Sequence, residues 1–430
     1  MSCEIPPEVL EYIQLVESDK LRACPEQHAL VALVRRAFET EDLRVETGRL
    51  EKYLGLQKYF PFVLFPWEKF LFTLWNCTYT AQGRPRWKTV LCMLGRGAGK
   101  DGYIAFDSAA SISPYNPVGH YNVDICAMNE DQATQPSRDL VEVLELPRYQ
   151  AKLNKHYYHT KEIIQGRKNR GVMKGRTNNP KGRDGMRSGK VIFNEVHAYE
   201  NYDNIKVFIT GLGKVADARI GYFTSNGEVS DGPLDDKLAQ GRRILFEGEP
   251  DGGMLPFICC LQSRDQVHDP ENWYMANPSL VYRPALLQET EDEYKEWLEH
   301  PEQNGDFLTK RMGLRAGQKE ISVTDYEKVK ATNRPLPDLR GWSCTVGVDY
   351  AELSDWAAVN LHFRRGEERF DLNHAWICAQ SKTLPRVKAP WKAWAEAGHC
   401  TVVEDVSSHP ALLAAYVGRA GQRYNLRRLG

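Results

Sequence analysis

Short apolar runs alternate with amphipathic segments along most of the chain, a pattern that predicts a mainly parallel sheet covered by helices. The runs with the composition of buried strands lie near residues 89–94, 122–128, 190–194, 219–224 and 256–261. Residues 8–60 show helical periodicity with many charges, and residues 273–314 also have a mostly helical pattern. We therefore expect a helical N-terminal segment at 1–60 and an α/β domain at 61–320.

The pattern changes after a polar stretch at 330–338 that contains two prolines and is typical of a linker. Strand-like runs then follow one another at 345–350, 357–363 and 370–377, before a helical segment near 391–397 and a strand at 400–403. Adjacent strands without an intervening helix predict a meander. We place the linker at 321–342 and a second α/β domain at 343–430.

A glycine-rich loop, Gly95-Arg96-Gly97-Ala98-Gly99-Lys100-Asp101, follows the first strand and opens a helical run. Glycines let backbone N–H groups approach phosphate oxygens, and Lys100 would reach the β- and γ-phosphates of a nucleotide. The loop is irregular, because Leu94 and Asp101 stand where a phosphate-binding loop usually has Gly and Ser or Thr. A plain glycine turn between strand and helix is the alternative interpretation.

The strand at 190–194 ends in Asn194-Glu195, which fits a catalytic Glu195 that orients or deprotonates an attacking water. Position 194 usually holds an Asp that helps to bind Mg²⁺, and Asn is a neutral and weaker ligand. Because Asp101 adds a carboxylate in the loop, we hypothesise that the metal-binding charge has moved there; otherwise Asn194 only caps the strand. A later strand ends in Thr224-Ser225-Asn226, whose small polar side chains could detect loss of the γ-phosphate.

Together these motifs resemble the large terminase subunit of tailed bacteriophages, a motor and nuclease that packages viral DNA. The glycine loop, the Glu195 strand, the Thr224–Asn226 segment, the stretch at 276–280 and the strand at 347–349 follow the family's order over nearly the whole chain. The resemblance implies an α/β fold: a P-loop ATPase of the additional-strand type with a mainly parallel sheet, followed by a ribonuclease-H-like nuclease domain. It implies ATP and Mg²⁺ as cofactors, with Arg96 sensing or stabilising the γ-phosphate.

Upstream, Phe65-Pro66-Trp67-Glu68 resembles the family's adenine-recognition segment, in which Gln generally follows Trp. Gln both donates and accepts hydrogen bonds, whereas Glu68 can only accept them. The recurrence of Trp67, Phe70 and Leu74 at helical spacing predicts an amphipathic core helix instead. We expect these aromatic residues to be mainly core, with Trp67 at the edge of the nucleotide pocket.

In the second domain the resemblance implies two metal ions, Mg²⁺ or Mn²⁺, held by carboxylates at strand ends. Asp349 would be the first ligand and Asp405 the second, with Glu404 as the rival for that role and Asp355 as an auxiliary. The family places a further acidic ligand beyond Gly430. We therefore expect the nuclease domain to be incomplete at the C-terminus and this polypeptide alone to cut DNA inefficiently.

Composition changes this picture only locally, since the net charge is −1 and the pI is about 6.8. Residues 161–190 hold ten Lys or Arg against two acidic residues, a net of +8, in a loop-like stretch rich in Gly and Asn. Such a stretch suits contact with DNA phosphates, and a solvated charged loop is the alternative. The ten cysteines follow no zinc or disulfide spacing, and neither a leader nor a membrane-spanning run is apparent, so we expect core thiols in a cytosolic protein.

The resemblance implies ATP-driven translocation of double-stranded viral DNA into a procapsid and metal-dependent endonuclease cutting of concatemeric DNA. It also implies a portal protein, a small terminase subunit and a homo-oligomeric ring as partners. The setting would be the cytoplasm of an infected bacterial host, with transient binding to the procapsid and no membrane. Two alternatives stay open: another P-loop nucleic-acid translocase or helicase, and an ATP-dependent DNA clamp with low turnover.

Overall fold

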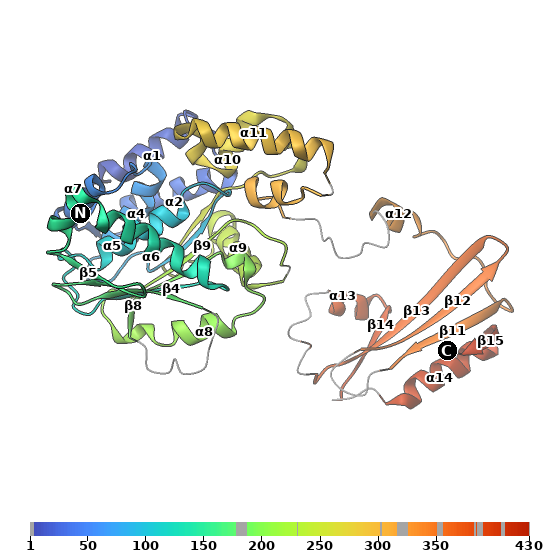
Figure 1. Ribbon diagram of the computed structural model, residues 1–430. Coiled ribbons are helices and arrows are strands. Elements are labelled where there is room, and N and C mark those ends of the chain that lie inside the picture. Colours follow the sequence, from blue (N-terminus) through green and yellow to red (C-terminus); the bar gives the residue numbers. More distant parts are fainter. Residues whose placement is uncertain are drawn as a thin grey trace. The chain divides into compact units, whose positions relative to one another are not determined.

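The computed structural model describes residues 4–177, 187–229, 231–301, 303–315, 326–350, 356–381, 384, 390–405 and 409–429. The chain divides into two compact units, residues 1–322 and 323–430, and each is considered by itself (Figure 1).

The first unit begins with helices that pack directly on its core. These are α1 (Pro7–Glu17), α2 (Pro25–Thr40), α3 (Thr47–Leu54) and α4 (Pro66–Cys77), and a short ribbon pairs β1 (Leu43–Val45) with β2 (Thr78–Thr80). Their apolar positions recur at helical spacing: Val9, Ile13 and Val16 of α1 are fully buried. The N-terminal helices therefore share one hydrophobic core with the sheet that follows them.

The central sheet has the strand order β10-β3-β9-β8-β4-β7-β6-β5. Its strands are β3 (Thr89–Met93), β4 (Asn122–Cys126), β5 (Tyr157–His159), β6 (Ile164–Gly166), β7 (Val172–Arg176), β8 (Ser188–Asn194), β9 (Arg219–Thr224) and β10 (Met254–Ile258). Neighbours from β10 to β7 are parallel, and β6 pairs antiparallel with both β7 and β5. The predicted strands are confirmed, and β9 is the additional strand between the glycine-loop strand β3 and the Glu195 strand β8.

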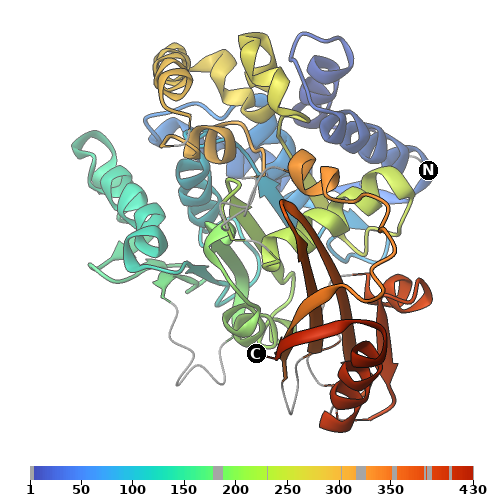
Figure 2. The same cartoon turned by 90° about the vertical axis from the view of Figure 1, so that its right-hand side faces the viewer.

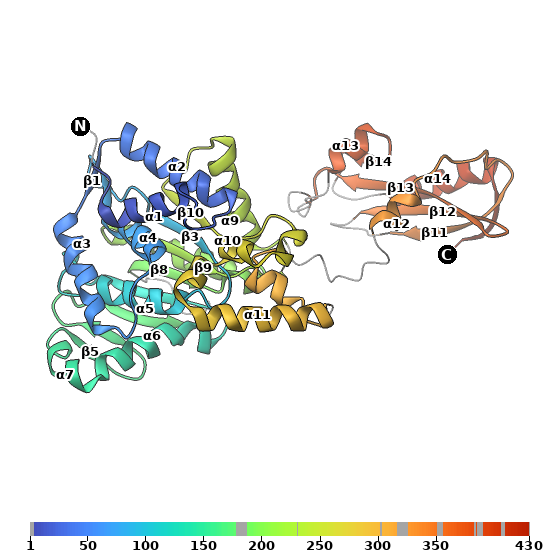
Figure 3. The same ribbon diagram turned by 90° about the horizontal axis from the view of Figure 1, so that it is seen from above.

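Helices cover both faces of this sheet (Figures 1 and 3). Successive strand residues point to opposite faces, so Val90 and Cys92 join one core while Leu91 and Met93 join the other. The first core also receives α5 (Lys100–Ser111), α6 (Glu130–Glu145) and α7 (Pro147–Leu153), and the second receives α8 (Asp203–Ile209) and α9 (Pro233–Arg242).

The stretch after β10 is mostly helical, as predicted. It contains α10 (Trp273–Ala276), the turn η7 (Pro278–Tyr282), α11 (Pro284–Glu299) and the turn η8 (Phe307–Arg311). Trp273, Trp297 and Phe307 build a separate aromatic cluster that holds these elements together. This cluster fixes the elements that reach back to the glycine loop, as described below.

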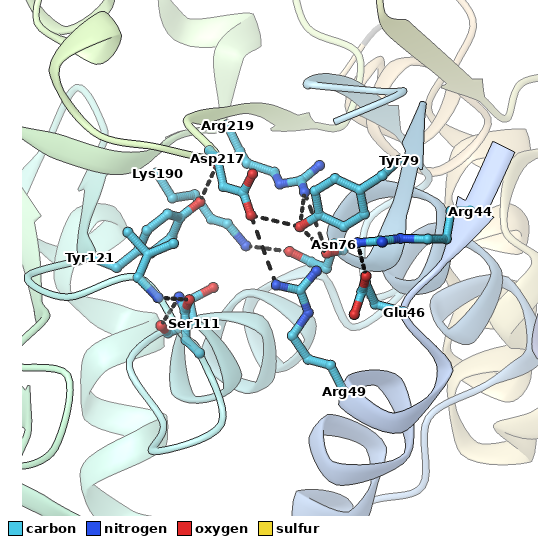
Figure 4. A network of polar contacts seen from close by, with 12 residues as sticks. Arg44, Glu46, Arg49, Asn76, Tyr79, Ser111, Tyr121, Lys190, Asp217 and Arg219 are labelled. Atoms are coloured by element: carbon cyan, nitrogen blue, oxygen red, sulfur yellow. Dashed lines mark hydrogen bonds and ion pairs between the residues drawn. The ribbon is translucent and has the colours of Figure 1, made fainter. Parts of the chain in front are cut away.

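A buried polar network lies at the amino ends of the parallel strands (Figure 4). Lys190 Nζ on β8 is 2.7 Å from Asp107 Oδ2 and donates to Asn76 Oδ1 at 2.8 Å. Arg219 on β9 donates to Asn76 O at 3.4 Å and to Tyr79 OH at 2.9 Å. Because free carbonyls at a helix C-terminus carry partial negative charge, the end of α4 can neutralise this buried guanidinium. The network ties α4 and α5 to the starts of two central strands.

The second unit is a five-stranded sheet in the order β14-β13-β12-β11-β15. Its elements are α12 (Tyr326–Ala331), β11 (Ser343–Asp349), β12 (Ala357–Arg365), β13 (Glu368–Cys378), α13 (Trp391–Glu396), β14 (Cys400–Val403), α14 (Pro410–Arg423) and β15 (Asn425–Leu429). The predicted meander is confirmed, because β11, β12 and β13 pair antiparallel, and β15 then pairs parallel with β11. Helix α14 packs on one face of the sheet (Figure 2), and Leu413 belongs to the same apolar cluster as Val359 and Leu361 of β12.

The cysteines of the described residues are free and buried, as expected for core thiols. Across the same residues, every helix is too short or too polar to cross a membrane.

Candidate active site

The glycine-rich loop lies between β3 and α5, at the sheet edge where the parallel strands end (Figure 3). Gly97 and Gly99 have φ values of 83° and 102°, in the left-handed region that favours glycine. Lys100 opens α5 and is only 7% exposed. The loop therefore leads into a helix N-terminus, where free backbone N–H groups favour a phosphate. Arg96 is half exposed and its guanidinium is 3.9 Å from Asp306.

Distant backbone segments brace this loop. Gly95 N donates to Ala276 O at 2.8 Å, and Arg96 N donates to Lys310 O at 2.6 Å. A Cβ at position 95 would lie 2.4 Å from Arg311 O, so a side chain has no room there. The stretch that contains Ala276, which the sequence placed only by its order, thus packs directly on the glycine loop.

Two arginines that the sequence did not single out also hold the loop. Arg283 Nη1 donates to Gly97 O at 2.7 Å, and Arg311 Nη1 donates to Arg96 O at 3.0 Å. Arg311 is nearly buried and forms ion pairs of 2.7 Å with two carboxylates of α11. Neither residue lies in a recognisable motif. Arginine is common in helical segments, and only their tertiary contacts distinguish Arg283 and Arg311.

The two irregular motif positions, Asp101 and Asn194, meet in space. Asn194 Nδ2 donates to Asp101 Oδ1 at 2.9 Å, while Asn194 Oδ1 accepts from Glu195 N at 3.2 Å. Burial raises the pKa of Asp101, and the hydrogen bond from Asn194 opposes that shift. Because the amide turns its nitrogen toward the carboxylate, Asp101 is the member of the pair that can offer an anionic oxygen to Mg²⁺. The contact makes Asn194 a hydrogen-bond donor to Asp101, and a metal-binding charge on the loop stays a prediction.

Glu195 is held by a histidine from the following turn. Its φ and ψ of 52° and 54° are left-handed, a conformation that costs a non-glycine residue about 1–3 kcal/mol and is concentrated at active sites. Glu195 Oε2 is 3.1 Å from His197 Nδ1, which is also 3.1 Å from Thr224 Oγ1. The backbone N of His197 donates to the same Thr224 oxygen at 3.0 Å. A histidine for which the sequence suggested no role therefore connects Glu195 to the end of β9.

The Glu195 carboxylate is charged, half-buried and incompletely paired. Burial tends to raise its pKa, but the contact with His197 and the charge of Lys100 outweigh this and lower the pKa to about 2. Oε2 has no aligned hydrogen-bond partner among the described residues, although His197 is close. A half-buried anion with free acceptor capacity can orient or deprotonate a water molecule.

The segment after β9 extends the contacts of this site. The Ser225 backbone hydrogen-bonds to Glu195, and Asn226 Nδ2 donates to Gly313 O at 2.9 Å. Leu94 N, at the start of the glycine loop, donates to Thr224 O at 3.0 Å. The predicted Thr224–Asn226 segment therefore touches both the loop and the glutamate.

A cavity of about 560 Å³ opens beside the loop. Gly99, Arg283 and Glu68 line it together with a mostly apolar wall from residues 60–65 and helices α5 and α6. Glu68 is 3% exposed, and its Oε2 accepts from Phe65 N at 2.7 Å. Burial raises the pKa of Glu68 to about 8, against the smaller opposing effects of that hydrogen bond and of Arg283.

Trp67 lies in the core, not in the lining of this cavity. It is 1% exposed, and its Nε1 donates to Ser279 Oγ, which in turn donates to Ala98 O at 2.8 Å. Phe70 and Leu74 are fully buried, so the prediction of a core helix is confirmed. The expected place of Trp67 at the edge of the pocket is wrong, because its link to the loop runs through Ser279.

The basic stretch at 161–190 is only partly a loop, since β6, β7 and the start of β8 lie within it. Lys190 is fully buried against Asp107 and cannot contact DNA, and Lys181 and Arg183 lie outside the described residues. Further positive charge lies in the residues that precede position 161. We call residues 147–177 the basic segment; they hold nine Lys or Arg against one acidic residue, a net of +8. Its exposed cations are Arg148, Lys152, Lys155, Lys161, Arg167, Lys168 and Arg170.

The carboxylates predicted to act in the second unit lie on separated strands. Asp349 ends β11, whereas Glu404 and Asp405 follow β14, and both β12 and β13 lie between those strands. Three strand spacings amount to about 14 Å, too wide for two metal ions about 4 Å apart. Among the described residues, no three His, Cys, Asp or Glu side chains are grouped so that they could hold a metal ion, and Asp355 lies outside that set. The described residues do not fit a formed two-metal site.

Comparison with known proteins relates the chain to phage terminases. Residues 251–408 match the family model "Terminase large subunit, endonuclease domain". The terminase large subunits of Lactococcus phages p2 and SK1 are each 28% identical over 208 residues, which is 48% of this chain and 38% of each relative. The crystal structure of the HK97 bacteriophage large terminase matches with a TM-score of 0.55 and 16% identity, over 90% of this chain and 80% of that one. The resemblance to large terminase subunits is confirmed, and so is the predicted fold class.

Proposed function

We propose that this chain, a relative of phage terminase large subunits, hydrolyses ATP at the glycine loop and uses the energy to move double-stranded DNA. The observation that carries the proposal is the convergence of Lys100, Asp101, Glu195 and Thr224 at the carboxyl ends of neighbouring strands. Ligands of open α/β sheets bind at this edge. The proposed roles are phosphate binding by the glycine loop and the Lys100 cation, metal binding by the Asp101 carboxylate, and action of charged Glu195 as the base.

In this proposal the loop N–H groups and Lys100 bind the triphosphate, and Asp101 holds a Mg²⁺ ion that shields the charge of the β- and γ-phosphates. Glu195 orients or deprotonates the attacking water. His197 keeps the Glu195 carboxylate close to Thr224. Loss of the γ-phosphate can therefore move both Glu195 and Thr224. Asn226 then extends the connection to Gly313, beside the turn that braces the loop.

Steady-state ATP hydrolysis with Mg²⁺, with and without duplex DNA, tests the proposal. Lys100→Ala and Glu195→Gln should each lower turnover by about 10²- to 10⁴-fold, because one removes a phosphate contact and the other the base. Glu39→Gln, at an exposed site of α2, serves as the control and should keep wild-type turnover. Undiminished turnover in Glu195→Gln would rule out the assigned base, and stimulation by duplex DNA would favour a DNA motor.

Duplex DNA is proposed to contact the basic segment, because +8 within 31 residues contrasts with −1 for the whole chain. Lys155→Glu with Lys168→Glu should weaken duplex binding and make the slope of log affinity against log salt shallower by about 2. Lys20→Glu with Lys52→Glu changes the net charge equally at exposed positions outside the segment. Equal losses in the two double variants would show that only total charge matters.

Cutting of concatemeric DNA, with Mg²⁺ or Mn²⁺, is proposed for the second unit on the family match. So are docking on a portal protein, a small-subunit partner, a homo-oligomeric ring, and action in the host cytoplasm and at the procapsid. Because Asp349 and Asp405 lie on separated strands, plasmid cleavage by this chain should be weak. Strong cleavage that Asp349→Ala abolishes would show that the carboxylates gather when metal or DNA binds.

A low-turnover ATP-dependent DNA clamp is the second candidate, and the neutral Asn194 beside Asp101 is the observation that favours it. Tight ATP and DNA binding with negligible hydrolysis under every condition would select the clamp. A helicase or other translocase remains the alternative within the motor class. Strand displacement would identify a helicase, whereas a packaging motor moves duplex DNA without unwinding it.

A further inference from the structure

We propose that the end of strand β7 and the first turn of helix α6 transmit the binding of duplex DNA to the hydrolytic site, with Arg176 as the residue that contacts a DNA phosphate. The inference rests on the proposed ATPase function and deepens it by naming how that site is regulated. It requires a cation placed for DNA, a rigid contact between β7 and α6, and a contact between α6 and the site.

Arg176 ends β7 at the same edge of the sheet as Glu195. In the pairing of the strands, Arg176 lies opposite Cys126 of β4, and Cys126 lies opposite Phe193 of β8, close to Glu195. Two strand spacings, about 10 Å, therefore separate the end of β7 from the Glu195 strand. The basic segment thus reaches the carboxyl edge of the sheet with its last cation.

A buried carboxylate holds the Arg176 guanidinium at one corner. Arg176 Nε donates to Asp124 Oδ1 at 2.7 Å, and Asp124 is only 3% exposed. The other Asp124 oxygen accepts from Ser188 Oγ at 2.5 Å, so both oxygens of the carboxylate are occupied. The Arg176 side chain is 31% exposed, and its two terminal nitrogens have no hydrogen-bond partner among the described residues. A guanidinium fixed in this way can present those nitrogens to a phosphate.

Strand β7 is in direct backbone contact with the first turn of α6. A Cβ on Gly175, which precedes Arg176, would lie 2.7 Å from Ala133 O and 3.0 Å from Thr134 Cγ2. Because protein interiors are close-packed, a contact without an intervening side chain leaves little room for independent movement. A displacement of the end of β7 should therefore move this turn of α6 as well.

The same turn of α6 contacts the hydrolytic site. Gln132 O accepts from Asn194 Nδ2 at 3.2 Å, and Asn194 also contacts Asp101 and the backbone N of Glu195. Asn129 caps the helix, because its Oδ1 accepts from Gln132 N at 2.8 Å. The cap therefore fixes the residue whose carbonyl holds Asn194.

These contacts form one continuous path from the basic segment to Glu195. A phosphate that binds Arg176 displaces the end of β7, and the contact at Gly175 passes this displacement to α6. The carbonyl of Gln132 then shifts Asn194, which contacts the backbone of Glu195. Contiguous packed segments of this kind can carry coupling between two sites. Duplex DNA thus changes the rate of hydrolysis by repositioning Glu195, without contacting the nucleotide.

The test compares ATP turnover by the chain with and without saturating duplex DNA, and duplex affinity is measured separately. Asn129→Ala removes the cap at a position that contacts neither ligand. It should keep the wild-type duplex affinity and the wild-type turnover without DNA, but lower the stimulation by duplex DNA about fivefold or more.

Arg176→Gln should weaken duplex binding and make the slope of log affinity against log salt shallower by about 1. Its stimulation should stay low even at saturating DNA. Asn201→Ala is the matched control: Asn201 Oδ1 accepts from Asp203 N at 3.0 Å at the start of α8, which packs on the other face of the sheet. This control should keep the wild-type affinity and stimulation.

The outcomes are separable. Wild-type stimulation in Asn129→Ala would overturn the role of α6, and full stimulation of Arg176→Gln at saturating DNA would overturn the role of Arg176. Wild-type turnover that duplex DNA does not change, but that Lys100→Ala abolishes, would overturn this inference and leave the ATPase intact. Absence of any turnover would overturn the proposed function and this inference with it. If Arg176→Gln does not fold because Asp124 is left unpaired, Arg176→Gln combined with Asp124→Asn removes both charges and takes its place.

Discussion

Charged side chains are paired differently at the two ends of the parallel strands in the central sheet. At the amino ends, Lys190 is paired with Asp107, and Arg219 is satisfied by carbonyls at the end of α4 (Figure 4). At the carboxyl ends, half-buried Glu195 has a left-handed conformation and an oxygen that lacks an aligned partner, near Lys100 and His197. Satisfied networks stabilise a fold, whereas incompletely paired groups are free to react. Incomplete pairing, and not charge alone, distinguishes the candidate site from the paired network.

The largest expected effect concerns the Lys190–Asp107 pair at the amino ends of the strands. Asp107→Ala leaves Lys190 as an unpaired buried cation and should lower the free energy of unfolding of the first unit by about 3–5 kcal/mol. Chemical denaturation followed by tryptophan fluorescence measures this loss. Glu17→Ala is the matched control: it removes an exposed ion pair of the same 2.7 Å length and should cost about 1 kcal/mol or less. Equal losses would mean that the network is not the stabilising element we infer.

The second largest expected effect concerns Glu195 at the carboxyl ends of the strands. His197→Ala should lower ATP turnover by about 10- to 100-fold with little change in ATP affinity, because the histidine positions Glu195 without touching the triphosphate. Separate measurements of the binding constant and of single-turnover hydrolysis distinguish these two effects. His300→Ala, at an exposed end of α11, is the control. A loss confined to affinity would contradict a positioning role.

The smallest expected effect, taken per pH unit, is the pH dependence of stability. Burial raises the pKa of Glu68 from its ordinary 4.5 to about 8, so the folded chain retains a proton that the unfolded chain releases. Stability should therefore fall as the pH rises from 4.5 toward 8, by at most about 1.4 kcal/mol per pH unit. Glu68→Gln should remove this component, as measured by denaturation at several pH values. The same slope in the variant would assign the titration to another group.

Much of the fold was predictable because the signals are local. The apolar runs that became β3, β4, β8, β9 and β10, and the meander of β11 to β13, follow from short stretches of sequence. The basic stretch shows where local reasoning fails: Lys190 has the same chemistry in a strand as in a loop, and only its place opposite Asp107 makes it a core residue. Likewise, a carboxylate at a strand end says nothing about strand order, so Asp349 and Asp405 could not be recognised as separated.

The glycine loop, the Glu195 strand and the polar segment after β9 could be recognised in the amino-acid sequence, because each is a contiguous motif whose chemistry depends on neighbouring residues. Which charges are paired depends on the folded chain. Asp101 meets Asn194 across 93 positions of the chain, and Lys190 meets Asp107 across 83. Arg283 and Arg311 reach the loop from helical elements with no motif of their own. These contacts require the assembled sheet, since its strand order and not the distance along the chain brings the groups together.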